Sequence, residues 1–314
     1  MDMLQVFLFG KFHIQYANQE LKGLSAAKAQ ELFCYLLLNS DRPFHRETLA
    51  AVLWSNVTTN QSKQYLRRTL WQLQNVFYGW NVLKNDELIF VDGDWIQFNS
   101  QAPLWVDAKC FEEKYRFTRG ISGKRLNGEG AKQLCDAIQI YQDNLLTGWY
   151  QDWCLFERER FQQMFLSALD KLMLYCEVCG KYEMGIEYGT RILRYDKARE
   201  HTHRRLMRLY CLSGNRTSAL RQYEQCKTIL NNELGIKPAK ITSKLYEQIC
   251  TPHQEYPLPI KLVNDGHLSQ KHQDAQKEQR EDRELQQIYG VLTSMQKQLQ
   301  QQIELVESLL NIQG

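Results

Sequence analysis

The chain has 314 residues, of which 43% are hydrophobic and 24% are charged, and its net charge is +3. This length predicts about two to three domains of roughly 100–200 residues each, and a composition with only six prolines argues against a collagen-like or broadly disordered chain. The longest apolar run, LFCYLLL at 32–38, is far shorter than the roughly 20 residues that cross a bilayer, so we expect no transmembrane helix and no membrane partner.

The N-terminus, MDMLQVFLFG, has no basic residue ahead of its apolar stretch, so it does not resemble a signal peptide. The nine cysteines are scattered along the chain and form no regular framework. Together these features predict a cytoplasmic protein with free thiols. The net charge is too small to identify a partner, so any nucleic-acid surface must come from local clusters of charge.

Short strands and helices alternate in residues 1–100. The strand-like segments are rich in aromatic and β-branched residues, and they lie at 4–10, 12–16, 88–91 and 95–99. Asp92-Gly93-Asp94 separates the last two, and this tripeptide predicts a hairpin because glycine accepts a positive φ angle. Three helices are predicted between the two pairs of strands, at about 26–39, 46–54 and 60–78. Ser25 is the expected N-cap of the first helix.

The third predicted helix, 60–78, has one apolar face, because Leu66, Leu70, Leu73 and Phe77 follow each other at helical spacing. Rotation by 100° per residue places arginine, glutamine and tryptophan side chains on the remaining surface. Arginine and glutamine suit the guanine and adenine edges of the major groove. The expected DNA-binding residues are Arg46, Gln61, Lys63, Gln64, Arg67, Arg68 and Trp71.

Basic charge is concentrated around this helix. Residues 42–84 contain six lysines and arginines and one acidic residue, whereas residues 1–100 contain nine of each sign. Among the expected residues, Arg67, Arg68 and Gln64 should reach bases, while Lys63 and Arg46 should hold phosphates. An arginine- and glutamine-rich face on an isolated helix would more often be an ordinary solvated surface. Here a helix, a short helix, a long basic helix and a hairpin follow in order, which predicts a winged helix-turn-helix.

Residues 106–250 are predicted to be helical throughout. Gly180 and Gly214 lie 34 residues apart, and apolar or small residues around them align at the same spacing. This period is typical of tetratricopeptide repeats, which stack helix–turn–helix units. A single pair of repeats cannot bury its own faces, so it should pack with the segment before it. We expect an aromatic set to cover the open end of the stack, namely Trp149, Trp153, Phe156 and Phe161.

After Cys250 the composition changes to a proline-containing stretch, so residues 251–270 are predicted to be a linker. Residues 271–314 are predicted to form a coiled-coil helix and to make the protein a homodimer. Its apolar seam consists of Leu285, Ile288, Leu292, Met295, Leu299, Gln302, Val306 and Leu309. The alternative is that this helix folds back on the helical domain of its own chain.

The remaining sequence patterns predict no metal site, nucleotide site or catalytic site. Cys176 and Cys179 form a CxxC motif without a second ligand pair, so core thiols are favoured over a metal site. The glycines at 120–125 lack the spacing of a phosphate-binding loop, and His201 and His203 should point to different faces as surface histidines. No nucleophile lies beside a base and no carboxylates are paired, so we predict no enzymatic activity, no cofactor and no metal.

Two halves of the chain resemble a family of bacterial regulators. Residues 1–100 are similar to the OmpR-type winged-helix domain of SARP and AfsR-like activators, in the segments LQVFLFGKFHIQYANQEL, AQELFCYLLLNSDRPFHRETLAAVLW and NQSKQYLRRTLWQLQNVF. Residues 107–250 resemble the bacterial transcriptional activator domain that follows it, in DNLLTGWYQDWCLFERERF and LRQYEQCKTILNNELGIKPAKITSKLYEQI. Two features depart from the family pattern: the hairpin tip 92–94 is acidic, and residues from 264 onward lie outside it.

The resemblance implies a sequence-specific transcription regulator, usually an activator that binds tandem repeats near a promoter. It also implies that the loop Ser55–Thr59 contacts RNA polymerase. We therefore predict a mainly α protein located at the nucleoid, with a winged helix at 1–100, a tetratricopeptide-like activator domain at 106–250 and double-stranded DNA as its partner. The alternative is a helical-repeat interaction scaffold whose N-terminal domain no longer binds DNA.

Overall fold

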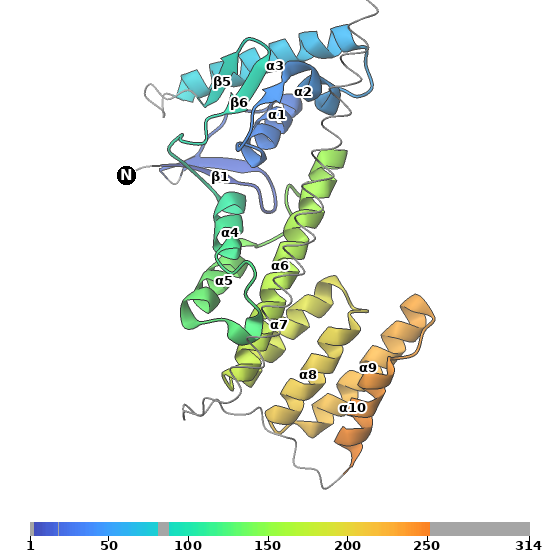
Figure 1. Ribbon diagram of the computed structural model, residues 1–314. Helices are drawn as coiled ribbons and strands as arrows, with labels where there is room; N and C mark the ends of the chain where they lie inside the picture. The colour runs from blue at the N-terminus through green and yellow to red at the C-terminus, as the bar shows by residue number, and fades with distance from the viewer. Residues whose placement is uncertain (1–2, 18, 81–87, 252–314) are drawn as a thin grey trace, which may run out of the picture. The chain divides into compact units, whose positions relative to one another are not determined.

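The computed structural model describes residues 3–17, 19–80 and 88–251 (Figure 1). The predicted linker at 251–270, apart from Thr251, and the predicted coiled-coil helix at 271–314 lie outside the described residues. The described part is mostly helical, with two small sheets in its N-terminal half. The predicted mainly α class, with a winged helix followed by helical repeats, is confirmed for these residues.

The first sheet holds the beginning of the chain. Its strand order is β3-β2-β1-β7, built from β1 (Leu4–Phe7), β2 (His13–Tyr16), β3 (Gln19–Glu20) and β7 (Leu104–Val106). β1 pairs antiparallel with β2, as the two strand-like segments predicted, and parallel with β7. The sequence analysis missed β7, because a three-residue strand whose partner lies a hundred residues away leaves no local pattern.

The winged helix-turn-helix follows in the predicted order. Its helices are α1 (Ala27–Leu38), α2 (Arg46–Leu53) and α3 (Thr59–Trp80), and its wing consists of β5 (Ile89–Asp92) and β6 (Trp95–Phe98). A further short strand, β4 (Phe44–His45), pairs with β6 and closes a three-stranded sheet. Gly93 at the wing tip has a φ angle of 55°, as the hairpin prediction required.

The predicted cap of α1 is wrong. The N-cap position is Ala26, and no side chain caps this helix end. The Ala26 carbonyl already accepts hydrogen bonds from the backbone N–H groups of Ala29 and Gln30, at 2.9 and 3.0 Å. Ser25 therefore lies one residue too early to accept from the first turn.

The second half contains seven α-helices and one 3₁₀ turn among the described residues. They are α4 (Asp107–Arg116), η1 (Gly123–Arg125), α5 (Gly128–Ile140), α6 (Asp152–Val178), α7 (Tyr182–Tyr195), α8 (Glu200–Leu212), α9 (Arg216–Leu234) and α10 (Lys240–Cys250). Each helix from α6 to α10 contacts the next one along the chain, which is the packing expected of stacked helical pairs.

The structure contains the predicted 34-residue repeat. Gly180 and Gly214 end successive turns with φ angles of 71° and 80°, which favour glycine. Leu172 and its counterpart Leu206 are both 1% exposed. The pair Gly185 and Ala219 is buried as well, and a Cβ atom at Gly185 would lie 3.0 Å from a methyl group of Leu209. Sequence periodicity thus identified which residues face the repeat core.

The two halves share one hydrophobic core. Phe9, just after β1, makes edge contacts with Phe111 of α4 and Phe161 of α6, at ring-centroid distances of 5.6 and 5.5 Å. The Trp153 indole N–H donates to the Glu31 carboxylate of α1 at 3.1 Å. The aromatic set therefore does not cover the open end of the stack as predicted. Trp149, Trp153 and Phe161 pack toward the winged helix, and Phe156 is 71% exposed.

Candidate nucleic-acid interface

The apolar face of α3 anchors this helix on the winged-helix core. Leu66, Leu70 and Leu73 are at most 5% exposed, and Phe77 packs on Phe33 of α1 with ring centroids 5.3 Å apart. α2 packs against α3 as well, so two helices fix its position. A rigid helix held on one side is what a base-reading element requires, because its free side chains then project at a defined angle.

The opposite surface of α3 faces solvent. The predicted base-reading and flanking residues are all exposed, namely Gln61, Lys63, Gln64, Arg67, Arg68 and Trp71. Trp71 is 64% exposed, which is unusual for so large an apolar side chain and indicates a contact surface. The structure thus brings together the residues of α3 that the sequence analysis singled out.

Arg46, the first residue of α2, is held by the wing. Its Nε donates to the Gly93 carbonyl at 3.0 Å and lies 4.0 Å from a carboxylate oxygen of Asp94. This contact explains the acidic tip of the wing: it attaches the hairpin to the start of α2. Arg46 was expected to hold a phosphate, and in the structure its guanidinium also contacts the wing.

Lys63 also has an internal partner. Its Nζ donates to Glu47 of α2 at 2.5 Å, and both side chains are exposed. The hydrogen bond and the positive charge of Lys63 lower the pKa of Glu47. This pair links α2 to α3 on the surface. By contrast, neither Arg67 nor Arg68 has a salt bridge within the described part of the chain.

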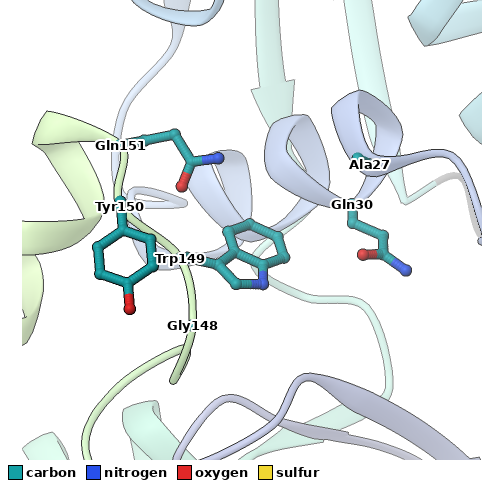
Figure 2. Close-up of a pocket in the computed structure, with 6 residues that line it drawn as sticks. All are labelled: Ala27, Gln30, Gly148, Trp149, Tyr150 and Gln151. Atoms are coloured by element: carbon teal, nitrogen blue, oxygen red, sulfur yellow. The ribbon is translucent and has the colours of Figure 1, made fainter.

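The loop before α3 borders a cleft. Residues 54–57 line about 600 Å³ of space together with α1 and with Tyr150–Trp153, the segment that enters α6. Figure 2 shows a second, smaller pocket, formed by Gly148–Gln151 against Ala27 and Gln30 of α1. Within the described residues, the buried Oε1 atom of Gln151 has no hydrogen-bond partner. The cleft beside residues 54–57 is therefore lined by residues from both halves of the protein.

Comparisons with known proteins identify a known domain in the second half of the chain. The bacterial transcriptional activator domain matches residues 106–250. The transcriptional regulatory protein MoaR1 from Mycobacterium bovis (strain BCG / Pasteur 1173P2), and its counterpart from Mycobacterium tuberculosis (strain ATCC 25618 / H37Rv), are each 29% identical over 137 residues. The solved structure of Mycobacterium tuberculosis EmbR in complex with a low affinity phosphopeptide aligns with a TM-score of 0.64 at 18% identity. Residues 106–250 contain the bacterial transcriptional activator domain, and this match and the two curated relatives support the predicted likeness to SARP-like bacterial activators.

The extent of each match limits what it shows. The match to the two MoaR1 proteins covers 41% of this chain and 43% of their length, so the chain spans less than half of the curated relatives it matches. The EmbR alignment covers 79% of this chain and 65% of EmbR, and at this identity it shows the fold alone. The predicted activator domain and the predicted fold are confirmed.

The structure also explains the CxxC motif, the glycine-containing segment 120–125 and the two neighbouring histidines. Cys176 is buried, as expected of a core thiol, but Cys179 is exposed, so the core prediction is wrong for this residue. Gly123 is required because a Cβ atom there would lie 2.4 Å from the Lys171 carbonyl oxygen of α6. His203 is not a surface residue as predicted: it is 1% exposed and makes hydrogen bonds with the Lys197 carbonyl and the Gln222 side chain.

The described residues offer neither a metal site nor a membrane span. No group of three or more histidine, cysteine or acidic side chains there could hold a metal ion. No helix in the same residues is long and apolar enough to span a bilayer.

Proposed function

We propose that this protein is a DNA-binding transcriptional activator that reads operator repeats with α3. The exposed face of α3, opposite its buried leucines, is the observation that carries the proposal. Arg67, Arg68 and Gln64 contact base edges in the major groove, where bidentate guanidinium and amide groups discriminate guanine and adenine. The names of the curated relatives, both transcriptional regulatory proteins, support regulation of transcription.

Lys63 and Arg46 hold phosphates in this proposal, although both have internal partners. The Lys63–Glu47 pair is exposed, and water and salt screen exposed ion pairs, so they add little stability. A phosphate can therefore replace Glu47 at small cost. Arg46 keeps its bond to the Gly93 carbonyl through Nε, which leaves its terminal nitrogens to point at the backbone of the duplex.

The loop Ser55–Thr59 contacts RNA polymerase in the same proposal. Val57 is 38% exposed in this loop, beside Val52 at 37%, so a small apolar surface is available next to the DNA-reading helix. The helical repeats carry further contacts with partner proteins. The predicted helix at 271–314 makes the protein a homodimer, which suits repeated half-sites.

The test is selection of bound duplexes from a random library with the full chain, followed by binding measurements at several salt concentrations. We expect one enriched repeated motif whose affinity falls steeply with salt, because phosphate contacts release counterions. If no duplex binds even at low salt, the alternative holds, and the protein is a helical-repeat scaffold whose winged helix no longer binds DNA.

A further inference from the structure

Positive charge is concentrated at the C-terminal end of the described residues. Residues 191–250 contain 13 lysines and arginines and 5 acidic residues, although the whole chain has a net charge of only +3. This charge is separate from α3, since these residues run from the end of α7 to the end of α10. A surface with one sign of charge attracts partners of the opposite sign and raises their rate of association.

Part of this charge forms a stripe along α8. His201, Arg204, Arg205 and Arg208 are spaced by three, one and three residues, so they share one face of the helix. Leu206, Met207 and Leu209, on the other side of α8, are at most 1% exposed. The stripe is therefore the surface that α8 retains after its apolar face has packed into the repeat.

Neighbouring helices define the two edges of the stripe. On the α6 side, Asp170 lies 3.1 Å from His201 and 2.8 Å from Arg205. On the α10 side, Arg204 donates to the Thr242 hydroxyl at 2.9 Å. These contacts hold the arginine heads in fixed positions, so little side-chain freedom is lost when they bind an anion.

Arg208 completes the stripe one turn further along α8. It is exposed, and no acidic group in the described residues forms a salt bridge with it. At the α6 edge, Asp170 contacts both His201 and Arg205, and on α8 itself Glu200 lies 4.0 Å from Arg204, so two carboxylates face the three arginines of the stripe. The stripe thus keeps excess positive charge at its solvent side.

α10 adds apolar surface next to this charge. Ile241 is 62% exposed and is adjacent in sequence to Thr242, the partner of Arg204. Lys240 and Lys244, one turn apart on α10, are exposed as well. In stacked helix pairs, α6, α8 and α10 are the first helices of successive pairs, and such arrays bind partners on extended surfaces of this kind.

We propose that the stripe of α8, together with Ile241 of α10, binds an acidic segment of a partner protein that also carries apolar side chains. Fixed guanidinium groups bind carboxylates in a bidentate manner, and Ile241 offers a contact that an aliphatic side chain of the segment fills. A DNA backbone supplies phosphates and sugars but no aliphatic side chains, so a peptide fits the surface better. This inference does not depend on DNA binding by α3.

The test is fluorescence anisotropy of the full chain with a labelled peptide of alternating glutamate and leucine. The matched control peptide has glutamine in place of every glutamate. We expect the acidic peptide to bind and the neutral one not to bind. Arg208→Glu should weaken binding about tenfold or more, whereas Arg221→Glu, an equal charge change at an exposed site of α9, should have little effect. Equal melting temperatures of both variants will show that folding is intact.

Three outcomes would overturn the proposal. The first is equal binding of the acidic and neutral peptides, and the second is unchanged binding by Arg208→Glu. The third is that an operator-free duplex displaces the peptide at physiological salt and itself loses affinity in Arg208→Glu, which would make the stripe a phosphate surface. Arg67→Ala/Arg68→Ala should leave peptide binding unchanged, so failure of DNA recognition and failure of this surface are distinguishable.

Discussion

Asp107, the first residue of α4, accepts a hydrogen bond from the backbone N–H of Phe9 at 2.8 Å. The same carboxylate also accepts from the N–H of Leu8, at 2.9 Å, and from its own neighbour Ala108. Asp107 is 3% exposed, and burial raises its pKa to about 6 although these hydrogen bonds lower it. The link between the winged helix and the activator domain therefore contains a titratable group.

This group should make stability depend on pH. Its pKa is higher in the folded protein than in the unfolded chain, so the folded state binds an extra proton between about pH 4 and pH 6. The free energy of unfolding should fall as pH rises through this window, by on the order of 2–3 kcal/mol from Asp107 alone. Below this window the contribution is fully present.

The measurement is urea unfolding of the parent and of Asp107→Asn from pH 4 to pH 7.5. The stability of the parent relative to the variant should decrease as pH rises to about 6.5 and then become constant. Parallel curves for the two proteins would contradict the assignment. Other titrating groups cancel in the difference, because both proteins contain them.

Substitutions on α3 should separate base contacts from phosphate contacts. Arg67→Ala and Arg68→Ala should each weaken operator binding by about 1–3 kcal/mol and relax sequence discrimination, because each removes a bidentate base contact. Lys63→Ala should weaken binding to all sequences alike and reduce the slope of the salt dependence by about one. Quantitative gel shifts on the operator and on a scrambled duplex measure both effects. Operator binding at parental strength by both arginine variants would show that a different face is used.

Two glycines should respond in opposite ways to alanine. At Gly123 the new Cβ atom would lie 2.4 Å from the Lys171 carbonyl oxygen and 2.9 Å from its Cα, so α6 or η1 must shift. We expect a loss of about 1–3 kcal/mol, as for overpacked sites. Gly128, at the start of α5, has open space around a Cβ, so Gly128→Ala should be neutral or stabilising by up to about 1 kcal/mol. Thermal and urea unfolding measure both, and equal effects would contradict the close approach at Gly123.

Fragments should show that the activator domain depends on its neighbours. A fragment starting at Gly180 should not melt cooperatively, because it lacks α6, on which α7 packs. A fragment of residues 106–250 should melt cooperatively but at a lower temperature than residues 1–256. It loses the contacts of Phe9 with Phe111 and Phe161 and the N–H donors of Asp107. Calorimetry compares the three proteins, and a cooperative transition in the shortest one would contradict this dependence.

The C-terminal segment should determine the oligomeric state. Its predicted seam at 285–309 runs for about three and a half heptads, and an isolated helix of such polar composition is marginal in water. Truncation after Val263 should therefore convert a dimer to a monomer and weaken operator binding. Light scattering on both chains decides this prediction. A full chain that is already monomeric would favour the alternative in which the segment folds back on its own helical domain.

The amino-acid sequence alone determined the features that arise from local periodicity. The spacing of Leu66, Leu70 and Leu73 identified the buried face of α3, and hence its exposed arginines, because helical geometry fixes which residues share a face. Gly180 and Gly214 identified the repeat, because each turn needs a left-handed residue at the same position. Short-range rules were sufficient for these elements.

Only the tertiary structure decided which surface covers which face. The apolar pattern around Trp153 and Phe161 indicated burial but not the partner, and the partner is the winged helix instead of the open end of the stack. The attachment of Arg46 to the wing and the pairing of β1 with β7 also join residues far apart in the sequence. Such contacts depend on how whole elements pack, and periodicity along one segment has no information about the segment that will lie against it.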